Sequence, residues 1–337
     1  MKPLRGVLMV RTLMEVDKLQ VGIQDDGIKT AIVNGISFQL NEGETLGIVG
    51  ESGCGKSMTA LSLMGLLPPG VEWQSGDIHL NDLHFKDFSK KDWRKVRGKK
   101  VSMIFQEPMS SLNPVYTVGK QIIEMILNHE NIDKKQARAR ALEMLQLVGI
   151  PRPEQVLDEY PHQLSGGMRQ RVMIAIAMSC NPEILIADEP TTALDVTIQA
   201  QILELMKKLQ QQLNMSIVLI THDLGVVAEM CDRVIVMYAG EIIEEAKIVD
   251  LFDQPKHPYT KGLLASLPDI NEQQEYLSSI PGMVPAPGSM PSGCRFAPRC
   301  SMVHERCTQS PPLIETENKN KVRCWLYDEA KLEVMTK

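Results

Sequence analysis

The sequence predicts an α/β fold built on a mostly parallel β-sheet. Two observations predict it: short apolar runs, each followed by polar residues, recur along the chain, and segments with helical spacing separate them. Apolar runs of this length are typical of strands buried on both faces, and their alternation with helices indicates βαβ units. Ligands of such sheets bind beyond the carboxyl ends of the strands. The polar residues that end each run are therefore the first candidates for a functional site.

The expected elements follow from these runs in chain order. Strands are predicted within residues 31–40 and at 45–50, 101–105, 184–187, 216–220 and 233–238. Helical spacing is found at 57–67, 121–128 and 134–148, and strand runs are absent between residues 106 and 180. That stretch predicts a helical insertion in the core. After about residue 251 the chain becomes rich in proline, which predicts a linker followed by a small C-terminal unit.

A phosphate-binding loop follows the strand at 45–50. Residues 50–57 read GESGCGKS and fit the pattern G-x-x-x-x-G-K-[ST] at every position. The glycines let the backbone wrap closely, so that N–H groups and the following helix N-terminus face phosphate oxygens. Lys56 supplies charge to the phosphates, and Ser57 supplies a hydroxyl ligand for Mg²⁺. The predicted ATP-binding residues are Gly50, Ser52, Gly53, Cys54, Gly55, Lys56, Ser57 and Met58.

A pair of carboxylates ends the strand at 184–187. Asp188 is placed to hold Mg²⁺, and Glu189 to polarise the attacking water as a general base. An isolated Asp-Glu pair is often only a solvated strand end, but the phosphate loop upstream favours the catalytic interpretation. The sequence therefore predicts a nucleoside triphosphatase.

Residues 164–171 read LSGGMRQR, and here the chain resembles the ATP-binding cassette (ABC) ATPases, whose signature is LSGGQ. The resemblance implies that Ser165, Gly166 and Gly167 contact ATP bound to a second subunit; Met168 departs from the usual glutamine. It further implies catalytic or Mg²⁺-contacting roles for Gln106, a γ-phosphate contact for His222, and a position near the opposite subunit for Asp195.

Three further stretches of the sequence resemble the di- and oligopeptide (peptide/nickel) importer branch of the ABC ATPases. The stretches that carry this likeness are 105–114 (FQEPMSSLNP), 160–163 (YPHQ) and 257–260 (HPYT). It implies a RecA-like P-loop core over residues 1–254, with a helical subdomain at about 107–180 and a C-terminal extension at 255–337. It also implies an ATPase paired with a sibling subunit beneath two permeases, at the cytoplasmic face of the cell membrane. An extracytoplasmic binding protein would deliver the peptide. Nickel or another small solute is the less favoured alternative substrate.

Other functional classes fit less well. The 36 basic and 42 acidic side chains give a formal net charge of −6, which does not favour nucleic-acid binding. A DNA-repair ATPase would carry heptad arms between the phosphate loop and residue 164, and that interval has none. A ribosome-acting factor would carry two cassettes, and a regulatory module without turnover would lack Glu189 or His222. No stretch is apolar for long enough to span a bilayer, and residues 1–10 do not read as a signal peptide, so membrane function is expected through partners.

Two features leave alternatives open. Residues 1–37 contain no Phe, Tyr or Trp to stack on adenine, so the adenine contact is expected to be aliphatic, from Ile23 or Ile28, or to come from elsewhere in the protein. Cys294, Cys300, Cys307 and Cys324 are spaced C-x5-C-x6-C-x16-C. Disulfides suit a chain without an export signal poorly, four thiolates could hold Zn²⁺, and all four could remain free. The family resemblance implies a [4Fe–4S] cluster on these cysteines.

Overall fold

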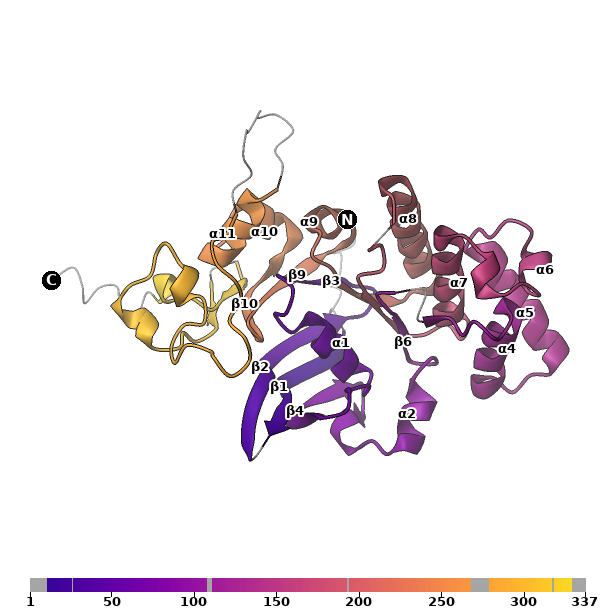
Figure 1. Ribbon diagram of the computed structural model, residues 1–337, viewed down its shortest axis with the longest axis horizontal. Helices are drawn as coiled ribbons and strands as arrows, with labels where there is room; N and C mark the ends of the chain where they lie inside the picture. Colours follow the sequence, from indigo (N-terminus) through magenta and orange to yellow (C-terminus); the bar gives the residue numbers. More distant parts are fainter. Residues whose placement is uncertain are drawn as a thin grey trace, which may run out of the picture.

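The computed structural model describes residues 11–25, 27–107, 111–192, 194–267, 279–316 and 318–328. Figure 1 shows a central sheet with an antiparallel sheet beneath it, a helical region at one end and the C-terminal segment at the other. Pro108, Met109 and Ser110 of the importer-like stretch, and the side chain of Ile28, lie outside this description.

An eight-stranded mixed sheet forms the centre of the molecule. Its spatial order is β11 (Ile314–Glu315), β12 (Lys321–Val322), β10 (Glu241–Lys247), β9 (Arg233–Tyr238), β3 (Thr45–Val49), β8 (Ser216–Ile220), β7 (Ile184–Asp188) and β6 (Val101–Ile104). The five strands from β9 to β6 run parallel, and every residue of β3, β7 and β8 is buried. The predicted α/β class is confirmed, because these apolar runs are the buried parallel strands.

A four-stranded antiparallel sheet lies against the core, and the sequence pattern did not predict most of it. Its order is β2 (Ile28–Asn41), β1 (Thr12–Asp25), β4 (Val71–Leu80) and β5 (Leu83–His84). Only β2 overlaps a predicted strand. The pairing of β1 with β2 shifts register between Val16 and Leu19, next to Lys18 with φ of 47°. Such bulges interrupt the period-two alternation by which a half-buried strand is recognised.

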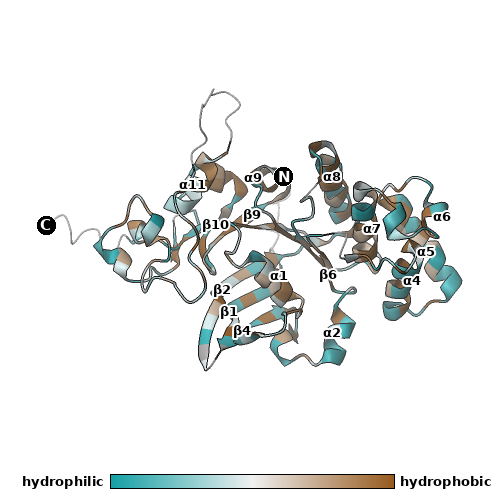
Figure 2. Cartoon of the chain, viewed as in Figure 1, coloured by the Kyte–Doolittle hydropathy of each residue, from teal (hydrophilic) through white to brown (hydrophobic). Residues whose placement is uncertain are grey.

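Helices cover the central sheet and fill the predicted insertion. They are α1 (Lys56–Leu63), α2 (Lys90–Val96), α4 (Val118–His129), α5 (Lys134–Leu147), α6 (Pro153–Val156), α7 (Gly166–Met178), α8 (Val196–Leu213), α9 (Leu224–Met230), α10 (Ile248–Asp253) and α11 (Pro258–Ala265). Helix α1 ends earlier than predicted, because Gly65 turns into the left-handed region at φ 60°. In Figure 2 the central strands are mostly brown, whereas the outer faces of α4 and α5 are teal.

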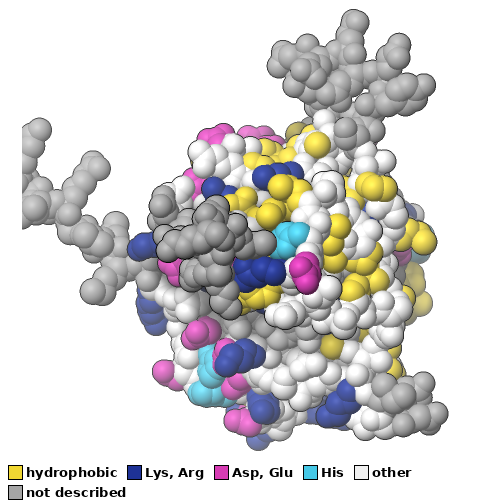
Figure 3. Space-filling view, turned by 90° about the vertical axis from the view of Figure 1, so that its left-hand side faces the viewer, with side chains coloured by type: hydrophobic (Ala, Val, Ile, Leu, Met, Phe, Trp, Pro, Cys, Tyr) yellow, Lys and Arg dark blue, Asp and Glu magenta, His cyan; other side chains and the backbone are white. Residues whose placement is uncertain are grey.

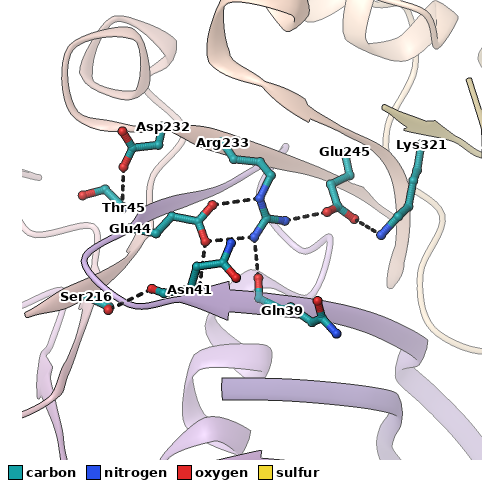
Figure 4. Close-up of polar contacts among 9 residues, drawn as sticks. All are labelled: Gln39, Asn41, Glu44, Thr45, Ser216, Asp232, Arg233, Glu245 and Lys321. Atoms are coloured by element: carbon teal, nitrogen blue, oxygen red, sulfur yellow. Dashed lines mark hydrogen bonds and ion pairs between the residues drawn. The ribbon is translucent and has the colours of Figure 1, made fainter. Parts of the chain in front are cut away.

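One half-buried arginine joins the two sheets and the C-terminal segment (Figure 4). Arg233 of β9 donates from Nε to Glu44 Oε1 at 2.8 Å and also pairs with Glu245 of β10. Lys321 of β12 reaches the other oxygen of Glu245 at 3.1 Å, and the backbone carbonyl of Gln39 in β2 accepts from Arg233. Both glutamates have side chains only 10% exposed. Ion pairs between largely desolvated charges therefore hold the two sheets and the C-terminal segment together.

The C-terminal segment is docked on the core through aromatic rings. Phe296 lies against Tyr238, Tyr259 and His257, with ring centroids 5.2 to 5.6 Å apart. Figure 3 views this end of the molecule and shows hydrophobic side chains at its surface; the exposed ones in this segment are Met283, Met302 and Val303. Among the described helices, none is both long and apolar enough to cross a bilayer.

Candidate functional site

The carboxyl ends of four neighbouring parallel strands bring the predicted site residues to one edge of the sheet. The phosphate loop follows β3, Asp188 ends β7, His222 comes just after β8, and Gln106 comes just after β6. Since these strands are adjacent in the order β3-β8-β7-β6, their ends meet at one place. The edge that the sequence marked is thus where the structure gathers the polar side chains.

The phosphate loop is shaped by glycines and centred on Lys56. Gly50 has φ of 150°, and a Cβ there would stand 2.2 Å from the carbonyl oxygen of Met237. Gly55 caps α1 in the left-handed region, at φ 105°. The Lys56 Nζ donates to the carbonyl oxygens of Gly50 at 2.7 Å and Glu51 at 3.0 Å. The loop therefore wraps around the buried ammonium group of Lys56, next to the N-terminus of α1.

The remaining loop residues differ in how much side chain they offer a ligand. Ser52, Gly53 and Ser57 are exposed, whereas Met58 is half-buried against the core. Cys54 is fully buried, and burial raises the pKa of its thiol while nearby Lys56 lowers it. Its side chain fills the loop from beneath, so that only its backbone can face a phosphate.

Ser57 and Asp188 form the candidate Mg²⁺ site. The Ser57 hydroxyl donates to Asp188 Oδ1 at 3.2 Å, across 131 residues of sequence. Burial raises the pKa of Asp188, the hydrogen bond from Ser57 lowers it, and the neighbouring charge of Glu189 raises it again. A hydroxyl beside a carboxylate suits a hard divalent cation, which takes oxygen ligands.

Glu189 is the centre of the predicted catalytic group. Its Oε2 accepts from Gln106 Nε2 at 3.0 Å and from Thr192 Oγ1 at 2.9 Å, and its Oε1 lies 3.1 Å from His222 Nδ1. Burial alone would raise its pKa, but hydrogen bonds from His222 and Thr192 and the charge of Lys56 lower it overall. The residue also adopts a left-handed backbone, φ 47°, which is a strained conformation that clusters at functional sites.

The signature residues lie on the helical region, away from the phosphate loop of the same chain. Ser165 caps α7, accepting from Met168 N at 3.4 Å, and Ser165 and Gly166 are exposed. Gly167 is half-buried, beside Ile198 of α8. Asp195 is exposed at the start of α8, where its Oδ1 caps Ile198 N at 2.9 Å. Figure 1 places α7 well apart from α1.

Four contributors to the site were missed by the sequence analysis. Thr192 donates to Glu189, and the buried Gln170 of α7 donates to the carbonyl of Pro190, next to that glutamate. Tyr259 Oη accepts from Glu51 N at 2.8 Å, and Arg299 pairs with the Glu51 carboxylate. The last two come from the C-terminal segment, and no local sequence signal links them to the loop.

The four C-terminal cysteines line one small cavity, together with His257, Phe296 and Trp325. Cys294 N donates to the carbonyl of Cys307 at 2.9 Å, and Met302 N donates to Cys300 Sγ at 3.3 Å. Burial and the other thiols raise the pKa of Cys324 to about 11. Among the described residues, no three of these sulfurs lie within 4.8 Å of one another.

Of the two aliphatic residues predicted to contact adenine, Ile23 is the one whose side chain the structure describes. Ile23 of β1 is 41% exposed, unlike its neighbour Val21, which is completely buried. It pairs across the sheet with Thr30 of β2. Its role toward adenine stays a prediction.

Comparisons with known proteins identify the family to which this chain belongs. The ABC transporter family profile matches residues 33–192, and the profile named oligopeptide/dipeptide transporter, C-terminal region, matches residues 243–307. The oligopeptide transport ATP-binding protein AppD of Bacillus subtilis is 55% identical over 94% of this chain and 98% of its own length. The chain belongs to the ABC transporter ATP-binding proteins. The dipeptide transport ATP-binding protein DppD of Haemophilus influenzae is 50% identical over 93% of this chain and 94% of its own.

Solved ABC cassettes share the fold of the core. A dimeric, post-hydrolysis structure of the cassette MJ0796 bound to ADP and Pi has a TM-score of 0.63 and 28% identity, covering 70% of this chain and 98% of that one. This ABC protein therefore has the ATPase core that the motifs predicted, and it binds ATP with Mg²⁺ and hydrolyses ATP. The C-terminal profile begins within β10, upstream of residue 255, and ends at Cys307, so it contains three of the four cysteines.

Proposed function

We propose that the chain hydrolyses ATP to power import of di- or oligopeptides through separate permease subunits. The observation that carries the ATPase part is the three-sided support of Glu189 by Gln106, Thr192 and His222 beside the Ser57–Asp188 pair. The peptide part is supported by the relatives named for oligopeptide and dipeptide transport.

Each residue has a part in the reaction that its geometry allows. Lys56 and the loop N–H groups bind the phosphates, and Ser57 and Asp188 hold Mg²⁺, which neutralises charge on phosphate oxygens when bound. Glu189 accepts a proton from the water that attacks the γ-phosphorus. His222 and Gln106, both exposed at the site mouth, hold that carboxylate in position and are free to reach the γ-phosphate and water.

We infer an ATP sandwich between two ATPase subunits. Ser165, Gly166 and Asp195 are exposed, and Figure 1 places helix α7, which Ser165 caps, well apart from α1. A second subunit placed head to tail would bring its signature donors to this chain's γ-phosphate. The dimeric MJ0796 cassette supports that arrangement. A related sibling ATPase, rather than a second copy, is proposed as the partner.

The rest of the importer complex is proposed from the same function, that of a peptide-importer ATPase. Two permeases are proposed to dock near the segment after Gln106, with an extracytoplasmic binding protein supplying peptide and the ATPases at the cytoplasmic membrane face. The proposed units are residues 1–254 for the ATPase, with a helical subdomain at about 107–180, and 255–337 for the extension. The extension is joined to the core sheet, because β12 pairs with β10 and β11 pairs with β12.

A [4Fe–4S] cluster is proposed on Cys294, Cys300, Cys307 and Cys324. All four cysteines line one cavity, and the N–H···S bond from Met302 to Cys300 is of the kind that tunes cluster sulfurs. Iron and sulfide analysis with the visible spectrum of anaerobically purified protein tests this; one zinc per chain in a colourless preparation would replace the cluster by zinc.

The function is tested with Glu189→Gln in a transporter reconstituted with its permeases. Hydrolysis should fall about 10²–10⁴-fold while ATP binding persists, because only the general base is removed. Lys56→Ala should instead lose ATP binding. Uptake of labelled peptides and of nickel into vesicles by the wild type then separates the two substrate classes: nickel uptake without peptide uptake would refute the peptide assignment.

A further inference from the structure

The hairpin of β4 and β5 carries a compact group of two histidines and one aspartate. Asp77 and His79 are two residues apart in β4, so their side chains leave the same face of the strand. His84 of β5 stands directly opposite His79 in the antiparallel register. The two imidazole rings meet edge to face, with centroids 4.4 Å apart. Strand periodicity and register thus bring three metal-ligating side chains together.

The ligand atoms have the spacing of a metal coordination sphere. Asp77 Oδ2 lies 3.2 Å from His84 Nδ1 and 3.6 Å from His79 Nε2, and all three atoms fall within 4.8 Å of one another. Ligands around a tetrahedral ion stand about 3.3–3.6 Å apart, given metal–ligand bonds of about 2.0–2.2 Å. The observed separations therefore need little adjustment to accept an ion.

The backbone orients the carboxylate. Asp77 Oδ1 accepts from Ile78 N at 2.7 Å and from Lys86 N at 3.3 Å, which leaves Oδ2 directed at the two histidines. Fixed outer partners of this kind preorganise a ligating group. The side chains of Asp77, His79 and His84 are 22%, 30% and 54% exposed, so an ion can arrive from solvent and water can complete its coordination.

We propose that Asp77, His79 and His84 form a binding site for a divalent transition-metal ion of the Zn²⁺, Co²⁺ or Ni²⁺ type. Two imidazole nitrogens and one carboxylate oxygen suit these borderline ions, whereas Mg²⁺ and Ca²⁺ require oxygen ligands. The site belongs to the antiparallel sheet and shares no residue with the phosphate loop or the C-terminal cysteines. A bound ion would link β4 to β5 and stiffen the hairpin.

Titration of the purified full-length protein with CoCl₂ tests the proposal. The visible spectrum distinguishes this site from the cysteines, because thiolate ligation adds intense sulfur-to-metal charge-transfer bands that nitrogen and oxygen ligands lack. The wild type should show d–d bands of nitrogen and oxygen ligation that saturate at one equivalent.

Three variants of the site and one control variant decide the assignment. His79→Gln and His84→Gln should weaken Co²⁺ binding at least about tenfold, and His129→Gln, a histidine outside the cluster, should leave the titration unchanged. Asp77→Asn keeps an oxygen acceptor for Ile78 N, and circular dichroism confirms that each variant is folded. Bands that persist equally in the His79, His84 and Asp77 variants, or a spectrum with thiolate bands only, would overturn the site.

Discussion

Arg299 forms a bidentate ion pair with Glu51, its two terminal nitrogens lying 2.6 and 3.0 Å from the two carboxylate oxygens. Glu51 is the second residue of the phosphate loop, and its backbone N–H also donates to Tyr259 Oη at 2.8 Å. The Arg299 side chain is only 6% exposed. The C-terminal segment thus holds both the backbone and the side chain of one phosphate-loop residue.

Arg299→Met is expected to weaken ATP binding several-fold and to lower the free energy of unfolding by about 2–4 kcal/mol, because the Glu51 carboxylate loses its partner in a partly buried site. Calorimetric ATP titration and denaturant unfolding measure the two effects. Arg138→Met is the matched control: it breaks an exposed pair with Asp158 and should cost less than about 1 kcal/mol. Equal ATP affinity in both variants would show that the contact leaves the loop unaffected.

Thr192→Val is expected to shift the acid limb of the pH profile of ATP hydrolysis to higher pH. Thr192 donates to the Glu189 carboxylate and is one of the contacts that lower its pKa. Its loss raises that pKa, so the base is protonated, and activity lost, at a higher pH. The measurement is kcat against pH at saturating ATP. Thr308→Val, which removes a hydroxyl in the C-terminal segment, should leave the profile in place; an unshifted Thr192→Val profile would contradict the assignment.

Ser165→Glu is expected to prevent ATP-driven subunit association without removing ATP binding. Its hydroxyl caps an exposed helix end that, in the proposed sandwich, faces the γ-phosphate of the other subunit. A carboxylate there repels the phosphate. Size-exclusion chromatography with ATP, in a Glu189→Gln background that blocks turnover, reads out association with the partner ATPase. Ser75→Glu on the antiparallel sheet is the control; association retained by Ser165→Glu would argue against the sandwich.

The catalytic edge of the sheet was predictable because its determinants are local. The strands β3, β7, β8 and β9 are apolar runs that the sequence shows directly, and the glycines of the loop after β3 sit at backbone angles that other residues rarely adopt. Asp188 ends a strand, and Glu189, His222 and Gln106 each follow a strand by one or two positions. Parallel pairing, a general property of such runs, brings those ends together.

The features of the fold and of the site that were not predicted depend on long-range packing. Strand β1 was not recognised, because its bulges near Lys18 break the alternation of buried and exposed residues. Arg299 stands 248 residues from Glu51, so no motif could connect them. The cysteine spacing gave the four candidate ligands, but only the structure shows that their side chains line a common cavity. Local patterns thus determined the phosphate site, and tertiary contacts determined its support.

Cys300→Ser is expected to weaken ATP binding in the same direction as Arg299→Met, because Cys300 directly follows Arg299 and lines the cavity that holds the cluster in our proposal. Loss of that ligand frees the short turn at residues 297–299, which positions the guanidinium. Contacts that act through one segment are non-additive, so the double variant should bind ATP about as weakly as Arg299→Met alone.

The measurement is a double-mutant cycle: calorimetric ATP titrations of the wild type, the two single variants and the double variant. Cys180→Ser, which alters a thiol in the helical region, controls for loss of any cysteine. Full additivity of the two free-energy changes would show that the cysteine cavity and the phosphate loop are independent.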